Sequence, residues 1–497
     1  MTQPVIKLQD VSFHYKDVTQ PSLQHINLQI HKGEVVVLCG ASGCGKSTLV
    51  RLMNGLIPFY YDGDIDGSVQ VLGHDTQQGT IYDLGCQMST VFQNPRSQFF
   101  CVDVKSELAF AAENLKLPKE EILSRMDKAA QELSLSPFME RTMFQLSGGE
   151  KQRIACACTA VTDSHIIVLD EPSSNLDMAA IAELKQMLLY WKQHGKTVVI
   201  AEHRLHYLHD VLDRVIYLRN GRIEEEWDQS TFRGLSSDAL TQRGLRNRSY
   251  AQLTIANTIP SHGELHLKDF RFFYKGMKTP SLDIPVLTLP SGAVVAIIGR
   301  NGAGKSTFVR ALCGLEKKAK GMLMDGKATY KTKQRLDRSF LVMQDVNHQL
   351  FTESVEEELN LSMKQENPQL LDILLTAFDL DDFRQKHPMA LSGGQKQRVA
   401  VASAIASQRD YIVFDEPTSG LDYFHMMQVA DCVKKLQKQG KTIFIITHDI
   451  ELIYACCNQV LHLADGRVKD CYVLNKQNEG RLQHFFDVDV SAPMPFK

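Results

Sequence analysis

The chain has 497 residues, of which 43% are apolar and 23% are charged, and its net charge is −3. This length is too great for one ordinary hydrophobic core, so two to four domains are expected. The composition is that of a globular protein, and the small net charge gives no reason to expect nucleic acid or an anionic membrane surface as the main partner. No stretch approaches the roughly 18 consecutive apolar residues of a membrane span.

The N-terminal stretch MTQPVIKLQD lacks a basic region followed by an apolar run, so no signal peptide is expected. The eleven cysteines are scattered and odd in number, which favours a reducing compartment over a disulfide framework. Cys156 and Cys158 stand two positions apart on an expected helix and point to different sides of it. We therefore expect structural thiols there, with a metal site as the alternative.

An internal repeat organises the chain. Only the middle of the repeat differs in length, because 101 positions separate Lys46 from Ser147 and 87 separate Lys305 from Ser392. We expect a first domain over 1–235, a linker over 236–262, a second domain over 263–475 and a tail over 476–497 without a readable pattern. The repeated segments are GASGCGKST (40–48) and GRNGAGKST (299–307), LSGGEKQR (146–153) and LSGGQKQR (391–398), VLDEP (168–172) and VFDEP (413–417), and VVIAEH (198–203) and IFIITH (443–448).

Each half begins with a strand that carries an aromatic residue. Tyr15 in FHY and Tyr274 in FFY lie 31 positions before Lys46 and Lys305, respectively. An aromatic face at this position could stack on an adenine ring. Ordinary strand aromatics are the alternative.

Short β-branched runs with almost no alternation come next, and among them are EVVVLCG (34–40), HIIVLDEP (165–172) and TVVIAEH (197–203). Strands buried on both faces of a mostly parallel sheet have this pattern. Helical periodicity lies between these strands, at Val104, Leu108, Ala111 and Leu115 in the first half and at Val355, Leu359 and Met363 in the second. Each half is therefore expected to be a wound α/β core with a helical insertion.

A Gly-rich loop follows the first buried strand of each half and opens a helix. Its spacing is that of a phosphate-cradling loop, in which backbone N–H groups face the phosphates, the Lys reaches the outer phosphates and the Ser hydroxyl faces Mg²⁺. Two copies in register argue against a chance Gly-rich turn. The expected ATP-binding residues are Gly40, Ala41, Ser42, Gly43, Cys44, Gly45, Lys46, Ser47 and Thr48, and Gly299, Arg300, Asn301, Gly302, Ala303, Gly304, Lys305, Ser306 and Thr307.

The segment VFQNPRSQFF (91–100) follows another expected strand. Asn94–Pro95 should end this strand, because proline fixes its own φ and restricts the residue before it. Gln93 is thereby placed at the strand end, beside Phe99 and Phe100. The second half carries MQDVNHQLF (343–351) at the corresponding place.

A Ser-Gly-Gly sequence precedes a helix in each half. Serine and two glycines at a helix N-terminus form an anion site with exposed N–H donors. Each half already has its own phosphate loop, so we expect these segments to cap the nucleotide of the other half. The residues are Ser147, Gly148 and Gly149, and Ser392, Gly393 and Gly394.

Two acidic residues follow the next apolar strand of each half. Asp170 and Asp415 end the strands, where a carboxylate can hold Mg²⁺ through water. Glu171 and Glu416 come next and point elsewhere, since side chains alternate, and we assign them to polarising the attacking water. The alternative is a pair of acidic residues that only mark the strand's edge, which the upstream phosphate loop disfavours.

A histidine ends a further apolar strand in each half. A lone histidine there is usually structural. His203 and His448 stand at the same position in both copies, which favours a hydrogen bond to the γ-phosphate and a role in steadying the water.

These motifs, in this order, resemble those of the ATP-binding-cassette (ABC) ATPases over nearly the whole chain. The resemblance implies an α/β fold with two P-loop nucleotide-binding domains, each a mostly parallel wound sheet with an antiparallel β portion and a helical insertion. In that family two halves close head to tail over two ATP molecules with Mg²⁺. The departures from the family's pattern are mild. Glu150 replaces the Gln that usually follows the Ser-Gly-Gly sequence, and Glu202 precedes His203 where Thr is common.

Carried over, the resemblance implies two composite sites. In this family the Gln after the strand binds Mg²⁺ and the water, which assigns that role to Gln93 and Gln344. SSNLD (173–177) and TSGLD (418–422) resemble the loops that cross the seam between halves. The first site combines Lys46, Ser47, Gln93, Asp170, Glu171 and His203 with Ser392–Gly394, and the second combines Lys305, Ser306, Gln344, Asp415, Glu416 and His448 with Ser147–Gly149.

A narrower resemblance concerns the partner. FQNPRSQFF and MQDVNHQLF are similar to the FQNP..Q.F pattern of the energy-coupling-factor ATPases, which serve vitamin and metal-ion uptake, and NGLIPFYYDGDIDGSV (54–69) also looks like that group. This implies a peripheral position at the cytoplasmic face of the membrane, with a membrane scaffold and a substrate-binding membrane subunit as partners. A groove for the scaffold's helix would be lined by Phe99, Phe100, Leu350 and Phe351, with packing inside the insertion as the alternative.

Other tandem ABC proteins are the rival interpretations. Sugar-import ATPases usually have a damaged second phosphate loop and lack its histidine, whereas Lys305 and His448 are present here. Peptide-import ATPases usually carry a Cys-containing C-terminal extension, which is not evident. A soluble ribosome-associated ATPase would have a long charged helical linker, whereas 236–262 is short, and repair cassettes carry zinc-binding Cys pairs or coiled coils that do not appear.

Overall fold

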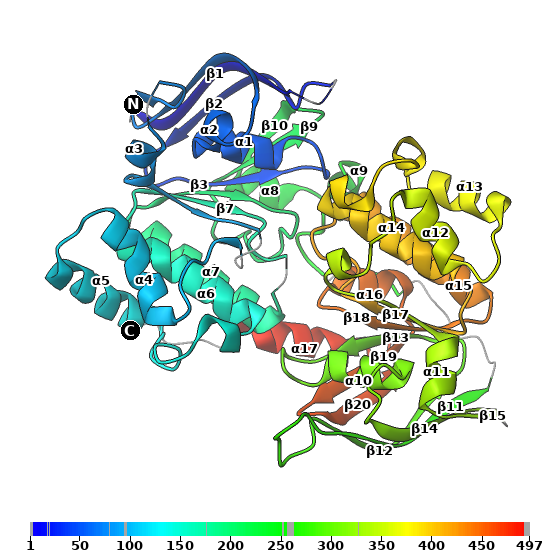
Figure 1. Ribbon diagram of the computed structural model, residues 1–497. Helices are drawn as coiled ribbons and strands as arrows, with labels where there is room; N and C mark the ends of the chain where they lie inside the picture. The colour runs from blue at the N-terminus through cyan, green and yellow to red at the C-terminus, as the bar shows by residue number, and fades with distance from the viewer. Residues whose placement is uncertain are drawn as a thin grey trace. The chain divides into compact units, whose positions relative to one another are not determined.

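The computed structural model describes residues 3–16, 18, 20–78, 80–93, 97–174, 176–250, 253–255, 263–326 and 328–491. The chain divides into two compact units, one of Met1–Ser249 together with the end of the chain from Val488, and one of Tyr250–Asp487. Each unit contains a four-stranded sheet, a six-stranded sheet and flanking helices (Figure 1). The predicted class, two α/β P-loop domains with an antiparallel portion and a helical insertion, is confirmed.

The first unit opens with an antiparallel sheet in the order β2-β1-β4-β5. Its six-stranded sheet has the order β10-β9-β3-β8-β7-β6, and all its neighbouring strands are parallel except β9 and β10. The strands are β1 (Pro4–Tyr15), β2 (Leu23–His31), β3 (Val35–Cys39), β4 (Gly63–Val71), β5 (His74–Asp75), β6 (Met88–Val91), β7 (Ile166–Asp170), β8 (Thr197–Ala201), β9 (Arg214–Arg219) and β10 (Arg222–Asp228).

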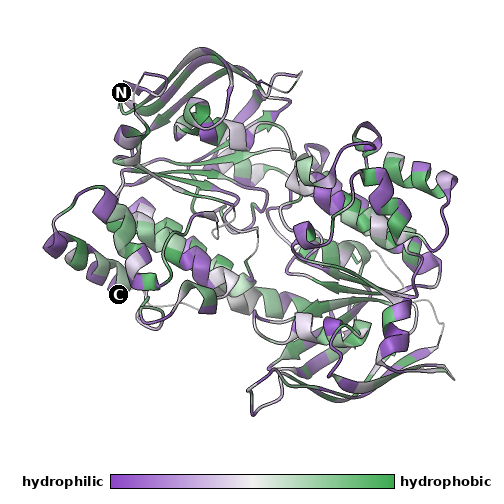
Figure 2. Ribbon diagram, in the orientation of Figure 1, coloured by the Kyte–Doolittle hydropathy of each residue, from purple (hydrophilic) through white to green (hydrophobic). Residues whose placement is uncertain are grey.

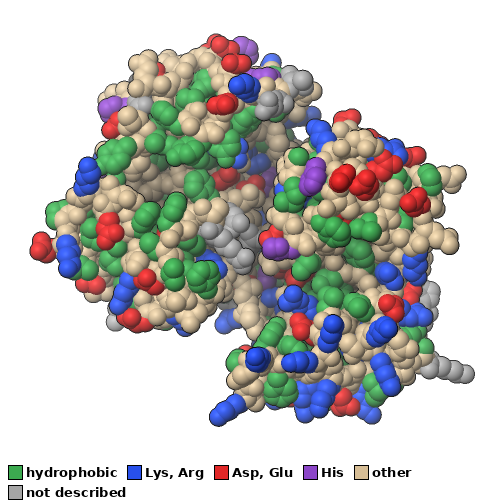
Figure 3. Space-filling view, in the orientation of Figure 1, with side chains coloured by type: hydrophobic (Ala, Val, Ile, Leu, Met, Phe, Trp, Pro, Cys, Tyr) green, Lys and Arg blue, Asp and Glu red, His purple; other side chains and the backbone are tan. Residues whose placement is uncertain are grey.

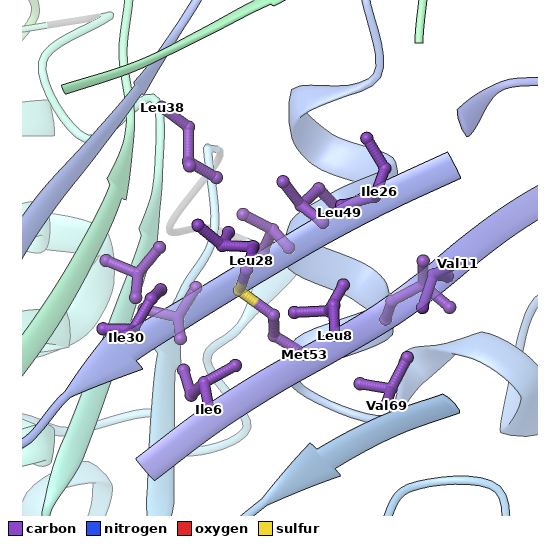
Figure 4. Packing of buried hydrophobic residues seen from close by; sticks show 14 of the residues in the cluster. Ile6, Leu8, Val11, Ile26, Leu28, Ile30, Leu38, Leu49, Met53 and Val69 are labelled. Carbon is purple, nitrogen blue, oxygen red and sulfur yellow. The ribbon is translucent and has the colours of Figure 1, made fainter. Parts of the chain in front are cut away.

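The buried residues of the first unit explain this arrangement. The central strands β3 and β8 are buried along their whole length, and Figure 2 shows the central strands as hydrophobic. Helix α1 (Lys46–Met53) lies between the two sheets, because Leu49 and Met53 join one core with Ile6 and Leu28 of the antiparallel sheet and Val36 of β3 (Figure 4). Burying both faces of the parallel sheet in this way requires the unbroken apolar runs seen in the sequence.

The remaining helices of the first unit cover the parallel sheet and form the insertion. The helix predicted from Val104 to Leu115 is α4, with Asp103 as its N-cap. The helices are α2 (Leu56–Phe59), α3 (Ile81–Gly85), α4 (Val104–Asn114), α5 (Lys119–Glu132), η2 (Met143–Gln145), α6 (Gly148–Thr162), α7 (Met178–Gln193), α8 (Gln229–Gly234) and α9 (Ser237–Gln242).

The second unit repeats the topology. Its sheets have the orders β12-β11-β14-β15 and β16-β17-β18-β13-β19-β20. The strands are β11 (Glu264–Phe272), β12 (Leu282–Pro290), β13 (Val294–Ile298), β14 (Lys320–Asp325), β15 (Ala328–Tyr330), β16 (Ser339–Val342), β17 (Tyr411–Asp415), β18 (Thr442–Ile446), β19 (Gln459–Ala464) and β20 (Arg467–Val473). The helices are α10 (Lys305–Cys313), α11 (Thr332–Arg338), η3 (Val346–His348), α12 (Val355–Ser362), α13 (Pro368–Ala377), η4 (Asp381–Phe383), η5 (Pro388–Ala390), α14 (Gly393–Ala406), α15 (Tyr423–Lys438), α16 (Ile450–Cys456) and α17 (Glu479–Ser491).

Two segments are more ordered than the sequence indicates. The start of the expected linker forms α9 and packs on the first unit, with Leu240 and Leu245 buried and the Tyr217 hydroxyl donating to the Arg243 carbonyl at 3.1 Å. The tail, for which no pattern is readable in the sequence, forms α17, which buries Leu482 and Phe486. The break expected at Asn94–Pro95 lies outside the described residues.

Candidate functional site: two phosphate loops with their acidic residues and histidines

The first phosphate loop joins β3 to α1. Gly40 has φ 149°, and a Cβ on it would lie 2.3 Å from the Leu218 carbonyl oxygen, so only glycine fits where the loop leaves the strand. Lys46 is buried, and its Nζ donates to the carbonyl oxygens of Gly40 at 2.9 Å and Ala41 at 3.0 Å. The ammonium group is thus held inside the curl of the loop, where the outer phosphates of a nucleotide are expected.

The second phosphate loop joins β13 to α10 with the same geometry. Gly299 has φ 148°, and a Cβ on it would lie 2.3 Å from the Leu463 carbonyl oxygen. Lys305 Nζ donates to the carbonyl oxygens of Gly299 at 2.6 Å and Arg300 at 3.1 Å. The two loops therefore share their strained glycine and the position of their lysine.

The serine and the aspartate expected to hold Mg²⁺ lie together in each unit. Ser47 Oγ donates to Asp170 Oδ1 at 3.1 Å, and Ser306 Oγ donates to Asp415 Oδ2 at 3.1 Å. Burial and the neighbouring Glu171 raise the pKa of Asp170 to about 6, and burial raises the pKa of Asp415. A carboxylate and a hydroxyl side by side are hard oxygen donors that suit Mg²⁺, and the penalty on their buried charge is one that a cation would relieve.

Glu171 lies at the centre of a cluster in the first unit. It accepts a hydrogen bond from Gln93 Nε2 at 2.6 Å, and its Oε1 lies 3.3 Å from His203 Nε2. Burial acts to raise the pKa of Glu171, but His203, Lys46 and Gln93 together hold it below its ordinary value. The structure therefore brings together the predicted base, the predicted Gln and the predicted His, with the carboxylate in its ionised form.

The second unit contains the corresponding cluster. His448 Nε2 lies 3.5 Å from Glu416 Oε1, and the same nitrogen lies 3.3 Å from Lys305 Nζ. Glu171 has φ 45° and Glu416 has φ 52°, a left-handed conformation that is unusual for glutamate and is found where a side chain must be aimed. Gln344 follows β16 in the equivalent loop.

The two predicted adenine-stacking tyrosines are fixed beside the helices that follow the phosphate loops. The Tyr15 hydroxyl lies 3.3 Å from Thr48 Oγ1 and accepts from Arg51 at 2.9 Å, and the Tyr274 hydroxyl lies 3.0 Å from Thr307 Oγ1. Each ring also meets a strand phenylalanine edge-on. Both tyrosines thus have the same anchored position, and their role toward adenine stays a prediction.

The two Ser-Gly-Gly segments begin α6 and α14, and Ser147 and Ser392 are the N-caps of these helices. Glu150 accepts from the Ser147 N–H at 2.7 Å, and Gln395 accepts from the Ser392 N–H at 2.9 Å. This capping needs only an oxygen acceptor, so Glu150 closes the capping box as the amide does. Gly148, Gly149, Gly393 and Gly394 form the first turns of these helices.

Sequence comparison decides the family. The sequence profile of the family described as ABC transporter matches residues 23–174 and 282–419. The chain belongs to the ABC transporter family. It is a tandem ABC ATPase, a type of protein that binds ATP, usually with Mg²⁺, and hydrolyses it.

A relative agrees with this membership, and two solved structures are similar to the chain. A Treponema denticola protein with the provisional name ABC transporter ATP-binding protein is 42% identical over 486 residues, which are 96% of this chain and 99% of that protein. The structure of cbiO1 from Clostridium perfringens, part of the ABC transporter complex cbiONQ, has a TM-score of 0.43 and 27% identity and covers 48% of this chain and 93% of its own. A chain of the ribosome-bound archaeal Pelota and ABCE1 structure has a TM-score of 0.69 and 20% identity, covers 96% of this chain and 80% of its own, and so shares the fold.

Two buried glutamates of this ABC ATPase are missed by sequence reasoning. Glu107 Oε2 accepts the backbone N–H groups of Phe100 at 3.0 Å and Cys101 at 2.7 Å. Glu358 does the same for Phe351 at 3.1 Å and Thr352 at 3.2 Å. The sequence does contain a sign of their role, because the two glutamates stand at the same offset from Gln93 and Gln344. A single Glu within a helical pattern, however, does not by itself indicate a buried site.

The four side chains expected to line a groove are not alike. Phe100 is 75% exposed and Phe351 is 73% exposed, whereas Leu350 is 2% exposed and Phe99 is partly buried. Leu350 is therefore a core residue of the insertion, and the expectation that it lines a surface groove is wrong. Burying Leu350 removes its apolar side chain from water, while the adjacent Phe351 is left exposed.

The pair Cys156 and Cys158 lies on α6. Burial raises the pKa of Cys156 to about 12, so its thiol stays protonated. Among the residues that the structure describes, no helix is both long and apolar enough to cross a membrane.

Proposed function

We propose that this tandem ABC ATPase is the ATP-hydrolysing subunit of an importer of the energy-coupling-factor type, which takes up a vitamin or a metal ion. The observation that carries the proposal is a pair of exposed phenylalanines, Phe100 and Phe351, held in the same way in both units. The loops that hold them begin at Gln93 and Gln344, so this surface and the hydrolytic cluster are joined by short stretches of chain.

The proposal includes two complete ATP sites. Both lysines, both serine–aspartate pairs and both glutamate–histidine pairs are present with matching distances. The N-termini of α6 and α14, which begin with the Ser-Gly-Gly segments, would supply the remaining hydrogen-bond donors to the nucleotides. Ser392–Gly394 would complete the site of the first phosphate loop, and Ser147–Gly149 would complete that of the second, because each unit already has one phosphate loop of its own.

The residues divide the chemistry among themselves. Lys46 and Lys305 bind the outer phosphates, Ser47 and Asp170 with their counterparts Ser306 and Asp415 would hold Mg²⁺, and Tyr15 and Tyr274 face the base. Bound Mg²⁺ supplies charge neutralisation on the phosphates. Glu171 and Glu416 accept the proton of the attacking water, while His203, His448, Gln93 and Gln344 orient that water and the γ-phosphate.

The exposed phenylalanines would receive a helix of the membrane scaffold. Phe100 stacks on Phe110 with ring centroids 5.1 Å apart, and Val102 and Phe144 of the same unit are also exposed. Hydrophobic side chains are visible at the surface over α4 and α5 in Figure 3. An exposed apolar cluster of this kind is typical of a docking surface. The partners proposed are a polytopic scaffold and a small substrate-binding membrane protein, at the cytoplasmic face.

Membrane fractionation tests this assignment. The double variant Phe100→Asp with Phe351→Asp should move the chain from the membrane fraction to the soluble fraction, because two charges would be placed in an apolar interface. ATP binding by the purified variant should be unchanged. Val286→Asp is the matched control, since Val286 is also exposed but lies on β12 of the antiparallel sheet. Membrane association of the double variant at the wild-type level would contradict the proposal.

A further inference from the structure

A buried carboxylate stands directly before the first catalytic histidine. Glu202 is 2% exposed. Its Oε1 accepts from the N–H groups of His203 at 2.7 Å and Arg204 at 3.1 Å, and its Oε2 accepts from the Ser173 N–H at 3.3 Å and the Tyr207 hydroxyl at 2.8 Å. Four donors therefore converge on this buried carboxyl group and fix its position.

These contacts join two loops of the hydrolytic cluster. Ser173 is the second residue after Glu171, and Glu202 is next to His203. Arg204, on the other side of His203, donates from Nη1 to the Ser173 carbonyl oxygen at 3.4 Å. Both polar groups of the Ser173 backbone are therefore held by the two residues that flank His203.

The second unit joins the same two loops with a different set of residues. Thr418, which corresponds to Ser173, donates from Oγ1 to Asp449 Oδ2 at 2.8 Å. Asp449 follows His448 and accepts from the Leu452 N–H at 3.3 Å as the N-cap of α16. The carboxylate thus comes after the histidine in the second unit and before it in the first.

The different position of the carboxylate explains a local difference in structure between the two units. With Asp449 as its cap the second unit starts helix α16 at Ile450. The first unit has Arg204 at that position and forms only turns over 206–211. The loop that carries His203 lacks a helix to support it, and Glu202 with Tyr207 is the support that the structure shows instead.

We propose that Glu202 is a positioning residue of the first ATP site, whose carboxylate holds the His203 loop against the loop after Glu171 and so sets the distance between His203 and Glu171. The inference rests on the assignment of His203 and Glu171 to hydrolysis under the proposed function. It predicts that Glu202 acts on the rate through His203 and not on ATP affinity.

Steady-state ATPase assays of the full chain carrying Glu416→Gln, in which only the first site hydrolyses ATP, test this inference with a double-mutant cycle. Glu202→Ala should lower kcat with little change in KM, by about ten- to hundredfold at the first site, because small misplacements of catalytic groups are costly. His203→Ala should lower kcat at least as much. The combination of both should be no worse than His203→Ala alone, since the two changes remove one function.

Further variants keep the test independent of folding. Glu202→Gln keeps one carbonyl acceptor and should retain more activity than Glu202→Ala. The triple variant Ser173→Thr, Glu202→Thr, Arg204→Asp transplants the arrangement of the second unit and should restore kcat relative to Glu202→Ala. Nucleotide binding, measured with a fluorescent ATP analogue, should be unchanged in all of them.

Two results would overturn the inference in distinguishable ways. A Glu202→Ala variant with wild-type kcat, or one whose loss multiplies with that of His203→Ala, would show that Glu202 does not act through His203. A His203→Ala variant with wild-type kcat would instead overturn the assignment of the hydrolytic cluster, and the inference would fall with it.

Discussion

His203 Nε2 lies 3.3 Å from Glu171 Oε1 in the first unit. The equivalent atoms of His448 and Glu416 are 3.5 Å apart in the second. The two residues of each pair follow strands that are adjacent and parallel in the sheet, β7 and β8 in the first unit and β17 and β18 in the second. The carboxyl ends of parallel strands meet at one edge of the sheet, which is where such sheets carry their active sites.

Replacing the predicted base is the first test of this geometry. Glu171→Gln keeps the shape and removes the proton acceptor, so hydrolysis at the first site should fall roughly 10²–10⁴-fold. Glu416→Gln is the matched change in the second unit. Single-turnover hydrolysis of labelled ATP measures both. Wild-type ATPase in Glu171→Gln would mean that the first site is degenerate and that the two-site account is wrong.

The acidic partner of Ser47 gives a prediction for stability. The pKa of Asp170 is raised from 3.8 to about 6, first by burial and then by Glu171. A raised pKa means that the folded state binds the proton more tightly, so stability should fall as pH rises from about 4 to about 6.

The variant Asp170→Asn should not lose stability over this pH range. Without nucleotide or Mg²⁺ it should melt several degrees above the wild type at pH 8, since about 1 kcal/mol shifts the melting temperature of a domain of this size by roughly 2–4 °C. The difference should shrink toward pH 4. Differential scanning calorimetry measures it, and a variant that melts lower than the wild type at pH 8 would contradict the assigned pKa shift.

Cys44 makes the first phosphate loop chemically different from the second. Its thiol is 4% exposed, and its Sγ lies 3.8 Å from Lys46 Nζ, whereas Ala303 stands at this position in the second loop. We expect maleimide labelling of Cys44 to be slow and to block nucleotide binding at the first site only, because the adduct would fill the curl of the loop.

Equilibrium binding of a fluorescent ATP analogue checks this prediction. Labelled protein should bind about half as much nucleotide as unlabelled protein. Nucleotide binding by Cys44→Ala should be insensitive to maleimide, and the alanine at this position of the second loop indicates that the substitution is tolerated. Full binding after stoichiometric labelling at Cys44 would rule the prediction out.

Glu107 and Glu358 provide a test of the surface that is separate from hydrolysis. Replacing either by Ala leaves two backbone N–H groups near Phe100 or Phe351 without their acceptor, at a cost of about 1–3 kcal/mol for a buried group. The loop should loosen, so the double variant should associate less with membranes while it still binds ATP. Membrane association equal to that of the wild type would argue against this surface as the docking site.

Much of the architecture could be predicted from the sequence. The unbroken apolar runs before Gly40 and Gly299 indicate central strands, and the repeated motifs place the phosphate loops, acidic residues and histidines at the ends of those strands. Strand burial and loop glycines leave local patterns in the sequence, because they depend on neighbouring residues. The pairing of Glu171 with Gln93 and His203 follows from strand order.

Other features have no local pattern. The contacts of Glu202 with Ser173 and Tyr207 join side chains to backbone groups of a distant loop, and a sequence offers no periodicity for them. The packing of α9 and α17 depends on a few buried residues such as Leu240 and Phe486, and each segment by itself reads as polar. The burial of Leu350 has no local pattern either, because Phe351 beside it is also apolar and no periodicity in this loop says which of the two faces inward.

The most direct test of the account is to identify what binds the chain in the cell. The tagged chain would be purified from detergent-solubilised membranes and its partners identified by mass spectrometry, with Phe100→Asp, Phe351→Asp as the control. The account predicts a polytopic scaffold protein and a small substrate-binding membrane protein, both lost in the control. A conventional permease pair would contradict the energy-coupling-factor type, and ribosomal proteins without any membrane protein would contradict the transport function itself.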